Sequence, residues 1–122
     1  MNKKKSQDSW TFTLNDCHPS LNAWTRMHFH VRNNLKKEWE QMTFYAAKEA
    51  KVPKIDFPIE IFITYYHPKK TVDLDNLVPK FILDGLKNFI VNDNIQWLTK
   101  LGWTIKTGDK SSVVEIKRSI LE

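Results

Sequence analysis

The chain has 122 residues, of which 41% are hydrophobic and 12% are aromatic. This is enough apolar material for one folded domain and too little length for two, which excludes a disordered chain and a multidomain enzyme. The net charge of +5 and the pI of about 9.3 favour a polyanionic partner, with nucleic acid the first candidate. Cys17 is the only cysteine, which excludes an internal disulfide and a four-cysteine zinc site.

The N-terminus is polar and basic, and no apolar run of signal-peptide length follows it. No segment reaches the roughly 18 apolar residues that a membrane span needs. We therefore expect residues 1–8 to form a disordered basic tail and residues 9–122 to form the folded domain. We expect the protein to be soluble and cytoplasmic, with no membrane partner.

Residues 9–14 alternate between apolar and polar side chains, which predicts a half-buried strand. The residues that follow, up to Asn22, are rich in turn formers and predict a loop. Aromatic and basic side chains are then interleaved, and they are Trp24, Arg26, His28, Phe29, His30 and Arg32. Such a mixture suits DNA, because rings stack on unpaired bases while Arg and protonated His meet phosphates. A surface loop with a few core-facing anchors is an equally good interpretation.

From about residue 33 to residue 51 apolar side chains recur every three or four positions, which predicts an amphipathic helix that Pro53 ends. Residues 57–66 are rich in β-branched and aromatic side chains and are apolar on nearly both faces. This pattern predicts a central strand. The acidic segment after it therefore begins where a strand gives way to a loop, a common place for functional residues.

A second helix is predicted over about residues 77–88, with Pro79 in its first turn, the one place where a helix tolerates proline. Lys80, Asp84 and Lys87 then fall on one face of this helix. We therefore expect Lys80 to lie close to the preceding acidic segment. We expect Asp84 to form a salt bridge with Lys80 or Lys87 rather than to bind a metal ion.

Residues 101–106 and 112–117 predict two final strands, and Gly108-Asp109 between them is a turn signal. Consecutive strands joined by a short turn predict a terminal β-hairpin. The predicted order of elements is β-α-β-α-β-β. We therefore expect an α+β fold, a single domain in which a mixed sheet packs against two helices.

Asp73 and Asp75 are separated by one residue, which in an extended segment places both carboxylates on the same side of the backbone. Two such anions repel each other unless a cation or a shared proton relieves the repulsion. Mg²⁺ suits this arrangement, since it binds a few carboxylates together with water and substrate phosphate. Asp93 follows after one predicted helix, and Lys80 offers a cation nearby, so the pattern favours a metal site. Asp and Asn also cap helices and form turns, and capping remains the alternative.

Two other interpretations of the acidic segment are excluded. An EF-hand loop would need an oxygen ligand and a glycine where Leu77 and Val78 stand. A phosphatase would place its nucleophilic Asp at the end of an apolar strand, whereas Lys69, Lys70 and Thr71 intervene here. A Mg²⁺ nuclease remains: acids hold the ion, the ion activates water and neutralises the scissile phosphate, and a lysine stabilises the added charge.

Several segments taken together resemble a known family. They are Asp73-Leu-Asp-Asn-Leu, Lys80, Asp84-Gly-Leu86, Asn92-Asp-Asn-Ile-Gln96 and, earlier in the chain, Pro19-Ser-Leu-Asn22. Over about residues 18–117 the chain resembles the RusA family of Holliday-junction resolvases. The resemblance implies a RusA-like fold and a homodimeric crossover junction endodeoxyribonuclease that nicks opposing strands of four-way DNA junctions in recombination and repair. It implies Mg²⁺ as the cofactor, with Mn²⁺ as a substitute.

Carried over by position, the resemblance implies that Asp73, Asp75 and Asp93 bind the metal ion. It implies that Lys80 acts as the catalytic or phosphate-contacting base. The residues expected to contact DNA are Asn22, Arg26, Arg32, Lys69, Lys70 and Asn76. Val72 stands where the family often has an arginine.

Two alternatives remain open at the level of the sequence. One is a non-catalytic basic DNA-binding module whose acids cap a helix and whose basic C-terminal strands supply affinity. The other is a flap or branched-DNA nuclease that uses the same metal site.

Overall fold

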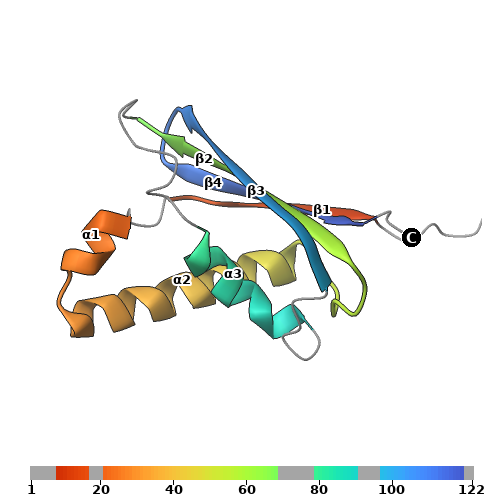
Figure 1. Ribbon diagram of the computed structural model, residues 1–122, viewed down its shortest axis with the longest axis horizontal. Helices are drawn as coiled ribbons and strands as arrows, with labels where there is room; N and C mark the ends of the chain where they lie inside the picture. Colours follow the sequence, from red (N-terminus) through yellow and green to blue (C-terminus); the bar gives the residue numbers. More distant parts are fainter. Residues whose placement is uncertain (1–7, 17–20, 69–78, 91–96, 120–122) are drawn as a thin grey trace, which may run out of the picture.

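The computed structural model describes residues 8–16, 21–68, 79–90 and 97–119. Over these residues the chain forms a four-stranded sheet with all of its α-helices on one side (Figure 1). The elements, in order, are β1 (Ser9–Leu14), α1 (Leu21–Arg26), α2 (Phe29–Glu49), β2 (Ile59–His67), α3 (Lys80–Leu86), the short 3-10 helix η2 (Lys87–Phe89), β3 (Leu98–Thr107) and β4 (Ser111–Arg118). The predicted α+β fold with a mixed sheet is confirmed.

The strands lie in the order β1-β4-β2-β3. β2 runs parallel to β3 and antiparallel to β4, and β1 runs antiparallel to β4. The apolar strand predicted to be central is therefore central. Its position follows from its composition, because a strand that is apolar on both faces is most stable with a partner on each side.

The predicted hairpin between the last two strands is wrong, because β2 lies between β3 and β4. The connection of residues 108–110 crosses the end of β2, where the Gly108 N–H donates to the His67 carbonyl at 3.0 Å. A Cβ at Gly108 would lie 3.1 Å from Cδ1 of Tyr66, so this crossing favours a residue without a side chain. A short connection is present at Gly108-Asp109 as predicted, but the two strands that it connects are not neighbours in the sheet.

The core lies between the helices and the inner face of the sheet. The strands contribute alternate side chains, which is why β1 shows alternating exposed and buried positions. The buried apolar residues of the strands are Trp10, Phe12, Leu14, Ile59, Ile61, Ile63, Tyr65, Val114 and Ile116. Those of α2 and α3 are Trp39, Ala47, Phe81, Ile82 and Leu86. Burying this surface supplies most of the driving force for folding.

The structure differs from the predicted boundaries before the long helix. Helix α1 includes Trp24 and Arg26, two of the aromatic and basic residues for which a surface loop was one interpretation. Helix α2 begins at Phe29, four residues earlier than predicted. The N-cap of α2 is His28, whose Nδ1 accepts a hydrogen bond from the His30 N–H at 3.2 Å. Histidine is not among the preferred N-cap residues, so the sequence carries no usual start signal at this position.

At the N-terminus the described part begins at Asp8, the last residue of the predicted tail. Its carbonyl accepts a hydrogen bond from the Arg118 N–H at 2.7 Å, and its carboxylate lies 3.5 Å from Nε of the same arginine. The rest of the predicted tail lies outside the described residues. None of the helices in the described ranges combines the length and apolar character that crossing a bilayer requires.

Candidate functional site

Most of the predicted site residues lie outside the described part of the chain. They are Asp73, Asp75, Asp93, Lys69, Lys70 and Asn76. Asn22 belongs to α1, and its side chain is also outside the description. The structure does place Lys80, Arg26 and Arg32. The grouping of Asp73, Asp75 and Asp93 around one ion therefore remains a prediction. The structure describes only neighbouring parts of the proposed site, which are the helices that carry Arg26, Arg32 and Lys80.

Lys80 is the first residue of α3, directly after Pro79. The helix begins there because proline tolerates the first turn, where its missing N–H has no intrahelical partner to lose. The Pro79 carbonyl accepts from the Leu83 N–H at 2.9 Å, which closes the first turn. This turn fixes Lys80 at the point where the chain passes from the acidic segment into the helix.

Packing against α2 fixes the rotation of α3. Phe81, Ile82, Gly85 and Leu86 are buried, so the opposite side of α3 carries Lys80 towards solvent. Gly85 faces Thr43 of α2, and the lack of a side chain there lets the two helices approach closely. The direction of the Lys80 side chain is therefore a consequence of the helix–helix contact.

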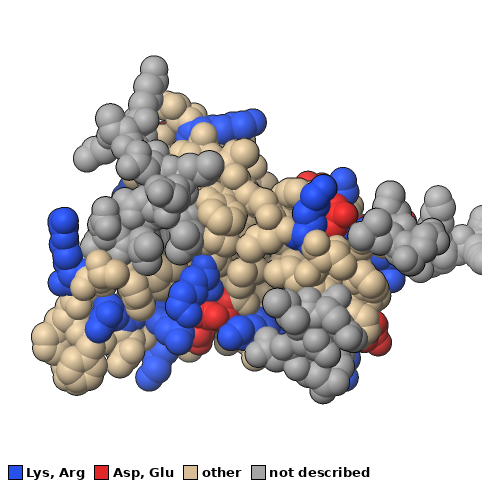
Figure 2. Space-filling model, viewed as in Figure 1, with Lys and Arg blue, Asp and Glu red and all other residues tan. Residues whose placement is uncertain are grey.

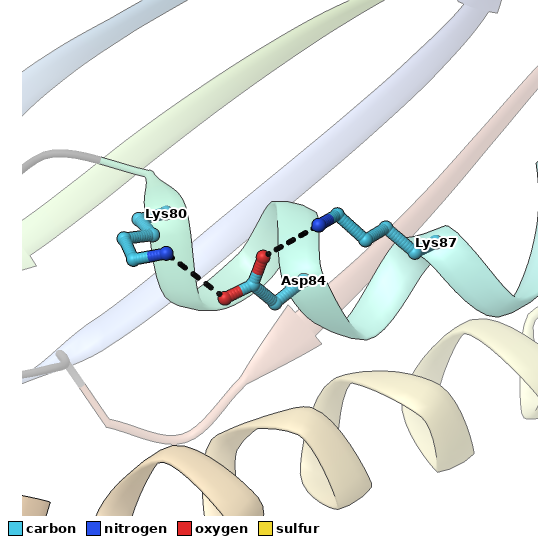
Figure 3. A network of polar contacts seen from close by, with 3 residues as sticks. All are labelled: Lys80, Asp84 and Lys87. Carbon is cyan, nitrogen blue, oxygen red and sulfur yellow. Dashed lines mark ion pairs between the residues drawn. The ribbon is translucent and has the colours of Figure 1, made fainter. Parts of the chain in front are cut away.

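Asp84 of α3 forms ion pairs with two lysines, one at the start of α3 and one at the start of η2 (Figure 3). Its Oδ2 lies 3.5 Å from Nζ of Lys80, and its Oδ1 lies 3.4 Å from Nζ of Lys87. The predicted salt bridge of Asp84 is confirmed, and it involves both of the lysines named as alternatives. The i,i+4 and i,i+3 spacings that place these side chains together are local properties of a helix.

The burial of the three side chains is unequal. The Asp84 side chain is only 10% exposed, whereas those of Lys80 and Lys87 are 61% and 54% exposed. Oδ2 of Asp84 is buried and accepts no hydrogen bond from the described residues. Both ion pairs are longer than the 2.7–2.9 Å typical of charge-assisted hydrogen bonds. Lys80 is the more exposed member of its pair, and Asp84 keeps its contact with Lys87 when the Lys80 ammonium turns to a phosphate oxygen.

Arg32 is connected to α3 through an aromatic contact, and Arg26 belongs to the same helix as the ring that makes it. Arg26 is exposed in the last turn of α1, and the Arg32 guanidinium lies 5.9 Å from the ring centroid of Trp24. The Trp24 ring in turn meets the Phe81 ring edge to face, with centroids 4.7 Å apart. Phe81 directly follows Lys80, so this contact fixes α1 next to the start of α3. The pattern of the sequence did not reveal this pairing, because the two rings are far apart along the chain.

Basic side chains outnumber acidic ones on the described helices, which carry Arg26, Arg32, Lys36, Lys37, Lys48, Lys80 and Lys87 against Glu38, Glu40, Glu49 and Asp84. Figure 2 shows Lys and Arg side chains gathered over the region of α1, α2 and α3, with few acidic side chains among them. Between Asp16 and Glu38 the sequence contains no acidic residue, but it contains Arg26, Arg32, Lys36 and Lys37. A surface of this kind attracts an extended polyanion.

The described residues that flank the two acidic segments lie at opposite ends of the sheet. His67, at the end of β2, pairs with Thr107, while Ile59, at the start of β2, pairs with Leu98. Segment 69–78 follows the carboxyl end of β2, and segment 91–96 precedes the amino end of the parallel strand β3. The helices between them, residues 80–89, span about 15 Å at the usual rise of about 1.5 Å per residue.

Among the described residues no three His, Cys, Asp or Glu side chains lie together in the manner of a metal site. The predicted ligands are outside these residues, so this observation concerns only the rest of the molecule.

No protein-family model matches this chain, and no curated protein matches it. The functional argument therefore depends on the residues themselves.

Proposed function

We propose that this protein is a Mg²⁺-dependent, structure-specific endodeoxyribonuclease of the cytoplasm that resolves four-way DNA junctions by paired nicks. The observation that supports the proposal best is the position of Lys80. Its largely exposed ammonium stands at the start of α3, immediately after the segment that carries Asp73 and Asp75. A cation next to paired carboxylates is the arrangement that phosphodiester hydrolysis needs.

The donor set fits a hard divalent ion, since Asp73, Asp75 and Asp93 offer only carboxylate oxygens. In this proposal they hold Mg²⁺, with Mn²⁺ as a substitute. The ion, when bound, activates a water molecule and neutralises charge on the scissile phosphate. Lys80 contacts the same phosphate and stabilises the negative charge that develops on it.

The residues proposed to hold the DNA backbone lie on both sides of the catalytic segment in the sequence. They are Asn22, Arg26, Arg32, Lys69, Lys70 and Asn76. Support comes from Arg32, whose guanidinium lies over the Trp24 ring that packs on Phe81 of α3, and from Arg26, which is exposed in the last turn of α1. Such contacts position the duplex without reading its sequence.

Paired nicks require two active sites. The chain carries one set of acids with one associated lysine, so we propose a homodimer with twofold symmetry. Each subunit then cuts one of two opposed strands of the junction.

A second candidate is a non-catalytic DNA-binding module. One observation favours it: Lys80 already has a partner, because Asp84 pairs with it and with Lys87. On this alternative the three side chains form an ordinary surface ion-pair cluster, and the basic helical side supplies affinity for DNA. A flap or branched-DNA nuclease with the same metal site is the closer alternative.

A cleavage assay separates the three functions. Purified protein is incubated with a synthetic four-way junction, a flap substrate and a linear duplex, each with Mg²⁺, with Mn²⁺ and with EDTA. We expect paired nicks in the four-way junction with either metal ion and none with EDTA. Faster cutting of the flap would favour the flap nuclease. Tight binding of the junction without any nick would favour the binding module.

A further inference from the structure

Three aromatic rings cluster on the surface where α1 leads into α2. The ring centroids of His28 and Phe29 are 5.1 Å apart, those of His28 and His30 are 5.1 Å apart, and those of Phe29 and His30 are 4.0 Å apart. The planes of His28 meet those of Phe29 and His30 at 25° and 26°, so these two pairs are stacked, whereas Phe29 and His30 are tilted by 36°. Because His28 also caps α2 through Nδ1, the cluster is held to the start of a long helix.

This cluster is exposed to solvent. Phe29 is 51% exposed and the neighbouring Val31 is 52% exposed, in a chain whose other large apolar residues are mostly buried or half-buried. In Figure 1 the first turns of α2 extend beyond the start of α3, with α1 beside them. Two of the three exposed large apolar residues among those described therefore lie at this projecting corner, and the third, Tyr45, lies further along α2.

The charge around the cluster is positive. Arg26 and Arg32 lie on either side of it in the sequence, followed by Lys36 and Lys37, and no acidic residue occurs between Asp16 and Glu38. An apolar ring surface surrounded by cations is complementary to a ligand with flat π faces and regularly spaced anions. A single-stranded nucleic acid has both.

We propose that this corner, which we call the ring corner and define as Arg26, His28, Phe29, His30 and Arg32, binds unpaired nucleotides. A base stacks on the exposed face of Phe29, and the flanking phosphates meet the arginines. The proposal rests on DNA being the partner named above, and it adds a second contact area to the proposed catalytic segment.

Unpaired nucleotides fit this corner better than duplex DNA does. In a duplex the faces of the bases are covered by their neighbours, so a ring on the protein surface has nothing to stack on. Bases at a branch point or a strand end expose their faces. The contact of Trp24 with both Arg32 and Phe81 connects the ring corner to the start of α3, and so to Lys80. Strands that separate near the proposed cleavage point therefore have a short path to the ring corner.

The experiment measures binding of labelled oligonucleotides by fluorescence anisotropy, in EDTA so that no cleavage intervenes. The probes are an oligothymidylate of about 12 nucleotides, within the usual site size of single-strand binding proteins, and an abasic chain of the same length. The abasic chain keeps every phosphate and lacks every base. It therefore separates stacking from charge.

We expect Phe29→Ala to weaken oligothymidylate binding about tenfold, the effect of losing one stacked base, and to leave binding of the abasic chain unchanged. Phe29→Tyr keeps a flat ring and should bind as the wild type does. Tyr45→Ala is the matched control, because Tyr45 is an aromatic side chain on the same helix that is 65% exposed. It lies about 24 Å from Phe29 along α2, at about 1.5 Å per residue, and its substitution should have no effect.

Arg26→Gln should weaken binding of both probes and make the salt dependence shallower by about 0.7 in the slope of log K against log salt concentration, as expected for one phosphate contact. Equal binding of oligothymidylate by Phe29→Ala and the wild type would overturn the proposal, as would an equal loss on both probes. The proposal would also be overturned if Phe29→Ala separated a dimer in light scattering while affinity for oligothymidylate was kept, since the ring corner would then be a subunit interface.

These outcomes are separate from those of the cleavage assay. Oligothymidylate binding that depends on Phe29 supports the ring corner even in a protein that does not cut junctions. Conversely, a protein that nicks junctions with Mg²⁺ but binds oligothymidylate equally well without Phe29 keeps the proposed function and loses only this inference.

Discussion

Gly85 of α3 lies against Thr43 of α2 so closely that a Cβ on Gly85 would stand 2.5 Å from the Cβ of Thr43. Glu40 also contributes its carbonyl oxygen, 3.1 Å from the same point. Only glycine permits this helix crossing without displacement of backbone. The crossing in turn determines which side of α3 faces solvent, and therefore that the Lys80 side chain is exposed.

The first prediction is that Gly85→Ala destabilises the protein. Alanine is the better helix former by about 1 kcal/mol, but forcing apart two packed helices typically costs about 1–3 kcal/mol or more. We expect a net loss on the order of 1–2 kcal/mol in the free energy of unfolding, measured by urea denaturation. Gly102→Ala is the control, because a Cβ there would lie 3.3 Å from a ring atom of Phe62, which is half-buried and able to move. Equal midpoints for Gly85→Ala and the wild type would contradict this account of the helix crossing.

The second prediction separates Lys80 from Lys87. The two lysines pair with the same carboxylate at almost the same distance and are similarly exposed, so Lys87→Ala is a matched control for Lys80→Ala. We expect Lys80→Ala to slow junction cleavage about 10²–10³-fold, the usual effect of removing one group that stabilises the transition state. Lys87→Ala should cleave at nearly the wild-type rate. Both variants should lose no more than about 1 kcal/mol of stability. Equal rates for the two variants would remove Lys80 from the chemistry.

The third prediction concerns Asp84 as a restraint on the two lysines. Asp84→Asn removes the negative charge that engages Lys80 and Lys87, so both ammonium groups become free to meet phosphate. We expect tighter binding of a four-way junction at low salt, measured by anisotropy in EDTA. The slope of log K against log salt concentration should become steeper by about 1–2. A slope unchanged from the wild type would mean that neither lysine lies within reach of the DNA.

The fourth prediction tests the proposed metal site. Asp75→Asn keeps the size of the side chain and removes one negative charge. On the nuclease proposal, cleavage of the four-way junction with Mg²⁺ collapses, while junction affinity in EDTA holds or rises because a carboxylate near phosphate has gone. Stability should not fall, because the repulsion between Asp73 and Asp75 is relieved. Glu115→Gln is the control, since it removes one carboxylate charge from the middle of β4, where Glu115 lies opposite Phe62 and away from both ends of β2. Nicking that survives in Asp75→Asn would exclude this residue from the site.

The fifth prediction concerns assembly. We expect light scattering at micromolar concentration to give about twice the 14.5 kDa mass of one chain, because paired nicks require two active sites. The cleavage products provide a second measurement: a dimer should nick both opposed strands within the lifetime of one complex. A monomeric mass together with single, uncoupled nicks would contradict the proposed homodimer.

Features that depend on near neighbours in the chain could be predicted from the sequence. The alternation in β1, the apolar character of β2 and the periodicity of α2 each predicted the correct type of element, because a strand repeats every two residues and a helix every 3.6. The ion pairs of Asp84 with Lys80 and Lys87 were predictable for the same reason. Spacings of three and four residues bring side chains together on any helix.

Contacts between distant parts of the chain were decided only by the tertiary structure. The turn at Gly108 predicted that β3 and β4 would pair, yet β2 lies between them, because strand order depends on which edges are available once the apolar strand has taken the centre. The packing of Trp24 on Phe81 joins residues far apart in the sequence. The clearance between Gly85 and Thr43 depends on how two helices cross, which no periodicity encodes. Local spacing determined which charges lie on α3, and packing across the core determined where that helix presents them.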